Sequence, residues 1–371
     1  MGKLRVGVIF GGRSGEHEVS LVSATSVLNA LDKGKYDVVP IGIAQSGRWL
    51  SSEKALQLLK TKNGIEREPE RFLVPEPNRQ ALMSINGESD RQLDVVFPVI
   101  HGTYGEDGKL QGLLELANIP YVGAGVLGSA LGMDKILQKQ LYEQEGILIP
   151  KYVWFLSSEF RQNSRKVVAE IEKHLKYPVF TKPANTGSSV GISKAHDRKE
   201  LREFLAVAAD YDRKVIVEQG VKNCLEIECS VLGNDSPIAS LPGEIIPSNE
   251  FYDYDAKYVD GKSTSIIPAD LPKKVVKEVQ QLAVKAFRVL DCAGMARVDF
   301  FITKKSNRIY LNEINTIPGF TSISMYPKLW EASGISYPQL LDKLIGLAIE
   351  KHRQKSGLKT VYEPSSDWYT S

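Results

Sequence analysis

Two carboxylates and an amide near the C-terminal end of the chain, Asp299, Glu313 and Asn315, could together hold a divalent cation, and Arg297 lies beside them in the sequence pattern. Both segments that carry them look like strands, and residues two apart in a strand share one side of a sheet. If residues 304–308 form the turn between the strands, Asp299 lies opposite Glu313 and Arg297 opposite Asn315. Directly opposed carboxylates destabilise a sheet unless a cation lies between them. Carboxylate and amide oxygens suit Mg²⁺, which usually also binds substrate phosphates. The sequence therefore predicts a metal-binding hairpin, and the alternative is a polar face that is merely solvated.

A loop of small residues follows Lys182 at the end of another predicted strand. It runs from Ala184 to Gly191, and its glycines and serines let backbone N–H groups approach phosphate oxygens. The lysine adds a point charge. The Walker pattern Gly-x-x-x-x-Gly-Lys-Ser/Thr is absent. We interpret the segment as a phosphate-binding loop of another kind, and the alternative is an ordinary surface loop.

Two further loops place chemistry-bearing residues after buried strands. Residues 11–20 hold three glycines and then acids, without the Gly-x-Gly-x-x-Gly order of dinucleotide-binding loops. Glu16 in this loop would repel a phosphate but attract an ammonium group; a helix start, where acids are favoured, is the alternative. Residues 101–108 begin with His101 and lie past a strand end, where open α/β sheets bind ligands. We favour a ligand-binding role for His101 over a purely structural one.

Two glutamates and one long loop complete the candidate residues. Glu218 ends a predicted strand and Glu226 begins the next, so either carboxylate could accept a hydrogen bond from an adenine amine or a ribose hydroxyl. Surface salt bridges explain these two acids nearly as well. Residues 251–258 are aromatic and charged within a long loop, a type of segment that often forms a lid. The alternative is a packed loop that its tyrosines anchor.

Composition limits the class of protein. A chain of 371 residues predicts two or three domains, and 42% hydrophobic with 25% charged residues is typical of a soluble globular protein. The net charge of +2 argues against a general nucleic-acid binder. Three cysteines without a Cys-x-x-Cys spacing predict a reducing compartment and no zinc site. No run approaches the roughly 18 apolar residues of a membrane span, so we expect a cytoplasmic protein with no membrane partner.

The elements that position these residues are predicted from the periodicity. Alternating strand, helix and strand signals at the N-terminus indicate a βαβ unit and a parallel sheet; the segments are 6–10, 19–31 and 36–43. Residues 51–90 read as a polar, irregular insertion with one short helix near 53–60. A single helix is predicted over 127–144, just after a glycine-rich boundary. In the hairpin, the apolar alternate positions predict the buried face: Val298, Phe300, Tyr310 and Ile314.

Six strings in the chain resemble the ATP-grasp family, and within it the D-alanine–D-alanine ligases, over residues 6–349. They are His17–Ser20, His101–Gly102 with Gly105–Gly108, Met133–Lys135, Gly187–Gly191, Tyr252–Tyr258 and Asn312–Gly319. All six in this order are highly specific. The resemblance implies an α/β fold of ATP-grasp architecture with an α+β third domain. A Rossmann-like N-terminal parallel sheet (1–123, with the insertion around 51–90) would precede two α+β domains, 124–219 and 220–355, that sandwich ATP; a polar tail (356–371) would follow.

The resemblance also implies an enzyme that joins two D-alanines through an acyl phosphate, for bacterial peptidoglycan, with release of ADP and phosphate. Its ATP-binding residues would be Lys135, Lys182, Ser188, Glu218, Glu226, Lys257 and Asn312. Asp299, Glu313 and Asn315 would hold two Mg²⁺ or Mn²⁺ ions. The amino-acid substrates would meet Glu16, His101, Arg297, Gly319 and Ser324.

The implied catalytic set is Glu16, Ser188 and Tyr258, a hydrogen-bonded triad that orders the lid, together with Arg297 at the tetrahedral centre. The family often has lysine at the position of Gln219, which bears on a contact to the base and not on the fold. The resembled family also implies a homodimer. Alternative functions are a D-alanine–D-lactate ligase, another ATP-grasp carboxylate–amine ligase, or a non-catalytic nucleotide sensor on the same fold; the intact metal set argues against the last.

Overall fold

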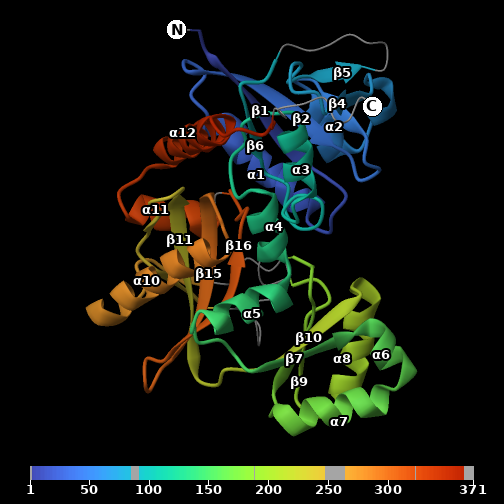
Figure 1. The fold of residues 1–371 in the computed structure, drawn as a ribbon, viewed down its shortest axis with the longest axis vertical. Coiled ribbons are helices and arrows are strands. Elements are labelled where there is room, and N and C mark those ends of the chain that lie inside the picture. Colours follow the sequence, from blue (N-terminus) through green and yellow to red (C-terminus); the bar gives the residue numbers. More distant parts are fainter. Residues whose placement is uncertain (1, 85–91, 188, 247–263, 322, 363–371) are drawn as a thin grey trace.

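The computed structural model describes the chain except for residues 1, 85–91, 188, 247–263, 322 and 363–371. The predicted site residues Ser188, Lys257 and Tyr258 therefore lie outside the described residues. Three sheets follow one another along the longest axis of the molecule, with the N-terminal one at one end and the smallest at the other (Figure 1). In the described part of the chain no helix has the length and apolar character that crossing a bilayer would require.

The first sheet has the strand order β5-β4-β3-β2-β1-β6. Its parallel strands are β1 (Leu4–Gly11), β2 (Tyr36–Ile43) and β6 (Val95–Pro98). Helix α1 (His17–Ala30) connects β1 to β2, so the predicted βαβ unit is confirmed.

The predicted insertion is less irregular than its composition indicates. It holds the predicted short helix, α2 (Ala55–Thr61), and a 3₁₀ turn, η1 (Ile65–Arg67). It also adds the antiparallel strands β4 (Arg71–Leu73) and β5 (Leu82–Ser84) to the sheet, next to β3 (Trp49–Ser51), which ends where the insertion begins. Strands of three residues are too short to show a period of two, which is why the sequence does not reveal them.

The predicted helix over 127–144 is wrong in one respect: it is two helices. After α3 (Lys109–Leu116), α4 (Val126–Met133) ends at Asp134 and α5 (Lys135–Gln144) begins there. The carboxylate of Asp134 accepts hydrogen bonds from the backbone N–H groups of the second and third residues of α5, as an N-cap does. This break places Lys135 in the first turn of α5.

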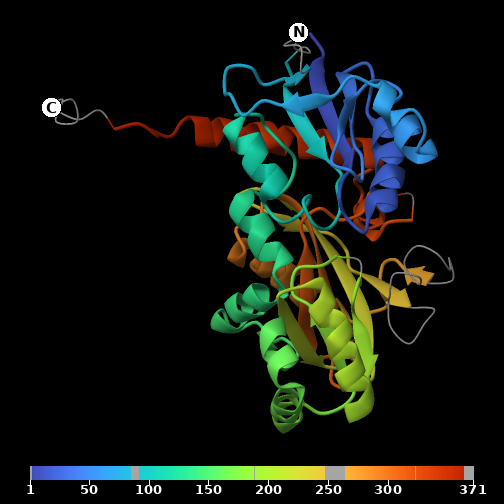
Figure 2. The same ribbon diagram turned by 90° about the vertical axis from the view of Figure 1, so that its right-hand side faces the viewer.

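The second sheet is antiparallel, with the order β7-β10-β8-β9. Its strands are β7 (Tyr152–Leu156), β8 (Val179–Pro183), β9 (Ser193–Ala195) and β10 (Lys214–Gln219). Three helices pack on this sheet: α6 (Ser157–Gln162), α7 (Ser164–His174) and α8 (Arg198–Tyr211). Figure 2 shows this small unit at the opposite end of the molecule from the N-terminal sheet.

The third sheet carries the hairpin. Its strand path is β14-β13-β11-β15-β16, with β12 paired to β11; the bounds are β11 (Cys224–Gly233), β12 (Ile238–Ala239), β13 (Gly243–Ile246), β14 (Thr264–Ile266), β15 (Gly294–Thr303) and β16 (Ile309–Asn315). Helix α10 (Lys273–Val289) covers it with an apolar stripe. After α11 (Met325–Ala332), the closing helix α12 (Tyr337–Ser356) returns to the first sheet, and its leucines share a core with β1 and β6. The first and third sheets are therefore held together by α12.

Candidate functional site

The hairpin has the predicted register where its charges lie. Asp299 pairs with Glu313 and Arg297 with Asn315. The register shifts by one residue between Asp299 and Phe300, so that Asn312 forms a bulge. The bulge changes which residues of β16 face the core.

One of the predicted core positions of the hairpin is therefore wrong. Val298, Phe300 and Ile314 are buried as predicted. Beyond the bulge, however, Leu311 is buried, whereas Tyr310 is only half-buried and lies under the Arg308 guanidinium at 5.4 Å.

Both acids of the hairpin attract cations. The Arg297 guanidinium donates from Nε to Asp299 Oδ1 at 2.8 Å and from Nη2 to Oδ2 at 2.7 Å. The amide of Asn315 donates to Asp299 Oδ2 at 3.1 Å. Glu313 has the Lys135 ammonium at 3.8 Å. Two carboxylates and an amide on the neighbouring strands β15 and β16 are a donor set that suits a hard divalent cation.

A cavity of about 570 Å³ lies between the second and third sheets, a size typical of sites for cofactor-sized ligands. Seven of the predicted site residues line it together: Lys182, Glu218, Glu226, Arg297, Asp299, Asn312 and Glu313. The Oδ1 atom of Asn312 is buried and has no hydrogen-bond partner among the described residues. An acceptor without a partner in this wall is a place where a ligand donor could bind.

A buried charge cluster forms the back of this cavity. Glu218 is 3% exposed, and its carboxylate has Lys182 Nζ at 2.9 Å and Lys139 Nζ at 3.1 Å. Burial alone would raise the pKa of Glu218, but the two ammonium groups outweigh it and the pKa is lowered. The cluster therefore holds an ionised glutamate between two lysines. Its excess positive charge would suit a phosphate.

Lys139 is a site residue that the sequence reasoning missed. It is 1% exposed and also donates to the Asn312 carbonyl at 3.2 Å. From α5 it thus contacts both walls of the cavity, β10 through Glu218 and β16 through Asn312. Its position one helical turn after Lys135 could have indicated a role in the same site, since residues four apart share a helix face.

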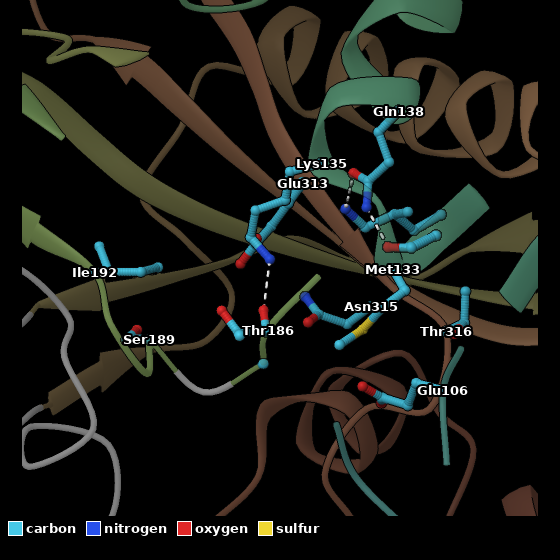
Figure 3. Close-up of a pocket in the computed structure, with 13 residues that line it drawn as sticks. Glu106, Met133, Lys135, Gln138, Thr186, Ser189, Ile192, Glu313, Asn315 and Thr316 are labelled. Carbon is cyan, nitrogen blue, oxygen red and sulfur yellow. Dashed lines mark hydrogen bonds and ion pairs between the residues drawn. The ribbon is translucent and has the colours of Figure 1, made fainter. Parts of the chain in front are cut away.

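A smaller pocket adjoins the large cavity and shares Glu313, Ser189 and Ile192 with it. Figure 3 shows Lys135 and Glu313 side by side at its rim, with the Lys135 ammonium directed at the Thr186 carbonyl; that hydrogen bond is 2.7 Å long. The two predicted motifs, the loop after Lys182 and the metal hairpin, therefore meet at this pocket.

Three predicted loops close around the Glu16 carboxylate. Glu16 is 7% exposed. A Cβ placed on Gly102 or on Gly187 would lie only 2.3 Å from Glu16 Oε2. Loops 11–20, 101–108 and 184–191 thus contribute to one buried acidic spot, although they come from two different sheets.

Glu106, a second residue that the sequence reasoning missed, lies beside this spot. It lines the small pocket and accepts from the Gly102 N–H at 3.1 Å. Burial raises the pKa of the Glu106 carboxyl well above its usual range, and Glu16 adds to the shift. The feature of the sequence that could have indicated Glu106 is the Gly-Glu-Asp-Gly string after His101.

His101 is buried between the first sheet and the segment that follows the hairpin. The Ile317 carbonyl lies 3.0 Å from its Nδ1, and the Ser23 hydroxyl lies 2.9 Å from its Nε2. Because a carbonyl can only accept, the neutral ring carries its proton on Nδ1, and the hydroxyl donates to Nε2. Burial lowers the pKa of His101, which favours this neutral form. His101 thereby fixes the Ile317 segment against α1.

Gly319 and Ser324 also lie together after the hairpin. A Cβ on Gly319 would be 2.7 Å from Ser324 Oγ. The same hydroxyl accepts from the Thr321 N–H at 3.0 Å. The Ser324 hydroxyl therefore lies beside the backbone of Gly319 and is held by Thr321.

Comparisons with known proteins give a consistent result. The family model described as "D-ala D-ala ligase N-terminus" matches residues 5–124, and the one described as "D-ala D-ala ligase C-terminus" matches residues 141–346. The D-alanine–D-alanine ligase of Natranaerobius thermophilus is 50% identical over 368 residues, which are 98% of this chain and 100% of the relative. That of Acetivibrio thermocellus is 52% identical over 365 residues, 94% of this chain and 97% of the relative.

Solved structures agree with the sequence matches. The D-alanine–D-alanine ligase from Coxiella burnetii is similar with a TM-score of 0.83 and 39% identity, covering 95% of this chain and 96% of the other. The VanG D-Ala:D-Ser ligase from Enterococcus faecalis is similar with a TM-score of 0.83 and 40% identity, covering 94% of this chain and 100% of the other.

Proposed function

The chain belongs to the D-alanine–D-alanine ligase family, and from this premise we propose how its residues carry out the family's reaction. It is an ATP-dependent ligase of ATP-grasp fold that joins two D-alanines to D-alanyl-D-alanine for peptidoglycan precursor synthesis. The observation that carries the proposal for its site is the cavity that Lys182 and Glu218 line together with the hairpin acids Asp299 and Glu313, with Lys139 buried behind Glu218.

We propose that ATP binds in this cavity. Lys135 and Lys182 would hold the phosphates, because Lys182 lines the cavity beside Glu218 and Lys135 lines the smaller adjoining pocket beside Glu313. Glu218 would accept from the adenine amine and Glu226 from the ribose. An ionised carboxylate has about four acceptor positions, so Glu218 can meet two lysines and still accept from the base.

The metal proposal rests on the donor chemistry of the hairpin. Asp299, Glu313 and Asn315 supply oxygens on adjacent strands, and both acids already have cationic neighbours. Two Mg²⁺ or Mn²⁺ ions, when bound, would neutralise charge on the phosphoryl group that moves.

The amino acids would bind beyond the phosphates. Glu16 would hold the ammonium of the first D-alanine, whose carboxylate becomes an acyl phosphate and so gains a good leaving group. Ser324 would bind the carboxylate of the second D-alanine, which attacks as a neutral amine. Arg297 and the Gly319 N–H would stabilise the oxyanion that develops. Exclusion of water would protect the acyl phosphate from hydrolysis. His101 would help to position the Gly319 N–H, because it fixes the segment that carries this residue.

The substrate assignment is tested by ADP release in the presence of ATP and Mg²⁺ with single D- and L-amino acids. We expect release with D-alanine and none above background with L-alanine; equal rates with the two enantiomers would rule out the assignment. Mixtures of D-alanine with D-serine or D-lactate test the second position, which the likeness to a D-Ala:D-Ser ligase makes worth measuring. Predominant ester from D-lactate at neutral pH would favour the depsipeptide alternative.

Substitution Gly187→Ala should weaken binding of the first D-alanine. The new methyl group would meet Glu16 Oε2 at 2.3 Å, and because that atom ends a flexible side chain, the carboxylate is expected to move while the fold stays. Losing a well-aligned charged hydrogen bond should raise KM for D-alanine by about 10-fold or more. The matched control is Gly112→Ala, whose methyl group meets nothing within 4 Å. An unchanged KM in Gly187→Ala would contradict the role of Glu16.

Because the reaction consumes ATP, we propose that the enzyme works in the cytoplasm. We also propose a homodimer, as the family implies. Sedimentation equilibrium over a range of concentrations would test the dimer, and a single species with the mass of one chain would refute it.

A further inference from the structure

Glu228 adds a third carboxylate to the row that the hairpin acids form. It lies on β11 directly opposite Asp299 of β15, and Asp299 lies directly opposite Glu313 of β16. The three acids thus occupy one register row across three neighbouring strands, and all three line the nucleotide cavity. Glu228 is 5% exposed. Like charges in directly opposed positions destabilise a sheet, so a cation is needed between each neighbouring pair of acids in this row.

Arg297 supplies the cation between the first two acids. Its Nε lies 3.1 Å from Glu228 Oε2, while the same guanidinium makes two hydrogen bonds to Asp299. Arg297 belongs to the adjacent row, where it lies opposite Ser230 of β11 and Asn315 of β16. The Arg297 side chain therefore extends from its own row into the next one, where it contacts the carboxylates of both Glu228 and Asp299.

We propose that Glu228 is a positioning residue that anchors Arg297 and so lets Asp299 bind a metal ion. The inference rests on the proposed function, in which Asp299 is a metal ligand and Arg297 meets the oxyanion. Binding of a divalent ion by Asp299 would weaken the two hydrogen bonds that this carboxylate accepts from Arg297. Glu228 would keep a counter-charge beside the guanidinium, which would then stay in place and repel the ion less strongly.

Neutralising Glu228 should strengthen the ion pair between Arg297 and Asp299. The Arg297 guanidinium is largely buried, with 17% of its side chain exposed. If Glu228 loses its charge, Asp299 is the remaining carboxylate that compensates the guanidinium, and the Arg297–Asp299 ion pair becomes stronger. A metal ion must then compete with Arg297 for Asp299. Glu228 would thus affect metal affinity without touching the metal, as residues behind metal ligands often do.

The test uses ADP as the probe, with its affinity measured by calorimetry in EDTA and again in Mn²⁺. The ratio of the two dissociation constants gives the gain that the metal brings, without turnover. For Glu228→Gln we expect this gain to fall by about 10- to 100-fold, with ADP affinity in EDTA and KM for D-alanine close to wild type. Glu228→Asp keeps the charge and should recover part of the gain. Glu244→Gln, on the neighbouring strand β13 and outside the cavity, is the matched control.

A double variant separates anchoring from direct ligation. If Glu228 acts through Arg297, the effect of Glu228→Gln disappears in an Arg297→Met background; an effect of full size there would overturn the inference, because Glu228 would then act on the metal itself. A wild-type gain in Glu228→Gln would also overturn it. Asp299→Asn tests the underlying metal site: if that variant keeps the full Mn²⁺ gain, the proposed metal function fails, whereas loss of the gain only in Asp299→Asn refutes the role of Glu228 alone.

Discussion

Asp299→Asn and Glu313→Gln should each reduce ADP release with D-alanine by at least about 10³-fold, since loss of charge stabilisation on a moving phosphoryl group costs several kcal/mol. Each change replaces a carboxylate by an amide of the same shape and removes one negative charge from the metal set. In Asp299→Asn the loss is larger, because the carboxylate also accepts two hydrogen bonds from Arg297 and one from Asn315. The measurement is a coupled assay of ADP at saturating ATP, Mg²⁺ and D-alanine.

Intact folding must be shown separately for these two variants. The circular dichroism spectra should match that of the wild type, and the midpoint temperatures of thermal unfolding should lie within a few degrees of the wild-type value. Glu278→Gln is a suitable control, because it makes the same chemical change on the exposed side of α10 and should leave turnover unchanged. Turnover near the wild-type level in Asp299→Asn or Glu313→Gln would refute the assignment of the metal set.

The register of the hairpin could be predicted because its information is local. A period of two, a five-residue polar turn and two acids at matching positions were enough to place Asp299 opposite Glu313. The bulge at Asn312 was not predictable, because an extra residue in a strand leaves no mark on composition. It reversed the face of every residue between itself and the turn, which is why Tyr310 was wrongly assigned to the core.

The meeting of the loops could not be derived from any single segment. The sequence predicts that loops 11–20 and 101–108 follow strand ends, and parallel strands bring such loops to one edge. Loop 184–191 belongs to the second sheet, and only the tertiary arrangement brings Gly187 within reach of Glu16. The resemblance to a family implied this meeting, whereas the residue pattern alone left each loop with a structural alternative.

Buried charges are the class of residue that sequence patterns miss most easily. A lysine on a helix and a glutamate in an alternating strand both read as solvent-facing, because isolated charges are rarely buried. Lys139 and Glu228 are buried only because each has an opposite charge from another element, at 3.1 Å in both cases. Such pairs depend on contacts far apart in the chain, so they emerge from the structure alone.

Lys139→Met should destabilise the protein and also weaken its selection of the nucleotide. Removing one partner of a buried ion pair leaves an uncompensated charge, at a cost of about 3–5 kcal/mol. The lower end is expected here, because Lys182 still pairs with Glu218. Loss of one ammonium group also raises the pKa of the Glu218 carboxyl, since burial then meets less opposition. The Asn312 carbonyl at the bulge loses a donor as well.

Three measurements test this prediction for Lys139. Denaturant unfolding gives the stability, calorimetry gives the ADP affinity, and the ratio of kcat/KM for ATP over inosine triphosphate, which lacks the 6-amine, reports how well Glu218 is held. We expect that ratio to fall in Lys139→Met and to be largely kept in Lys139→Arg. Adding Glu218→Gln to Lys139→Met should recover neither stability nor the ratio, because buried Lys182 then loses the carboxylate with which it pairs. If Lys139→Met unfolds as the wild type does and selects ATP equally well, Lys139 neither supports the cavity nor orients Glu218.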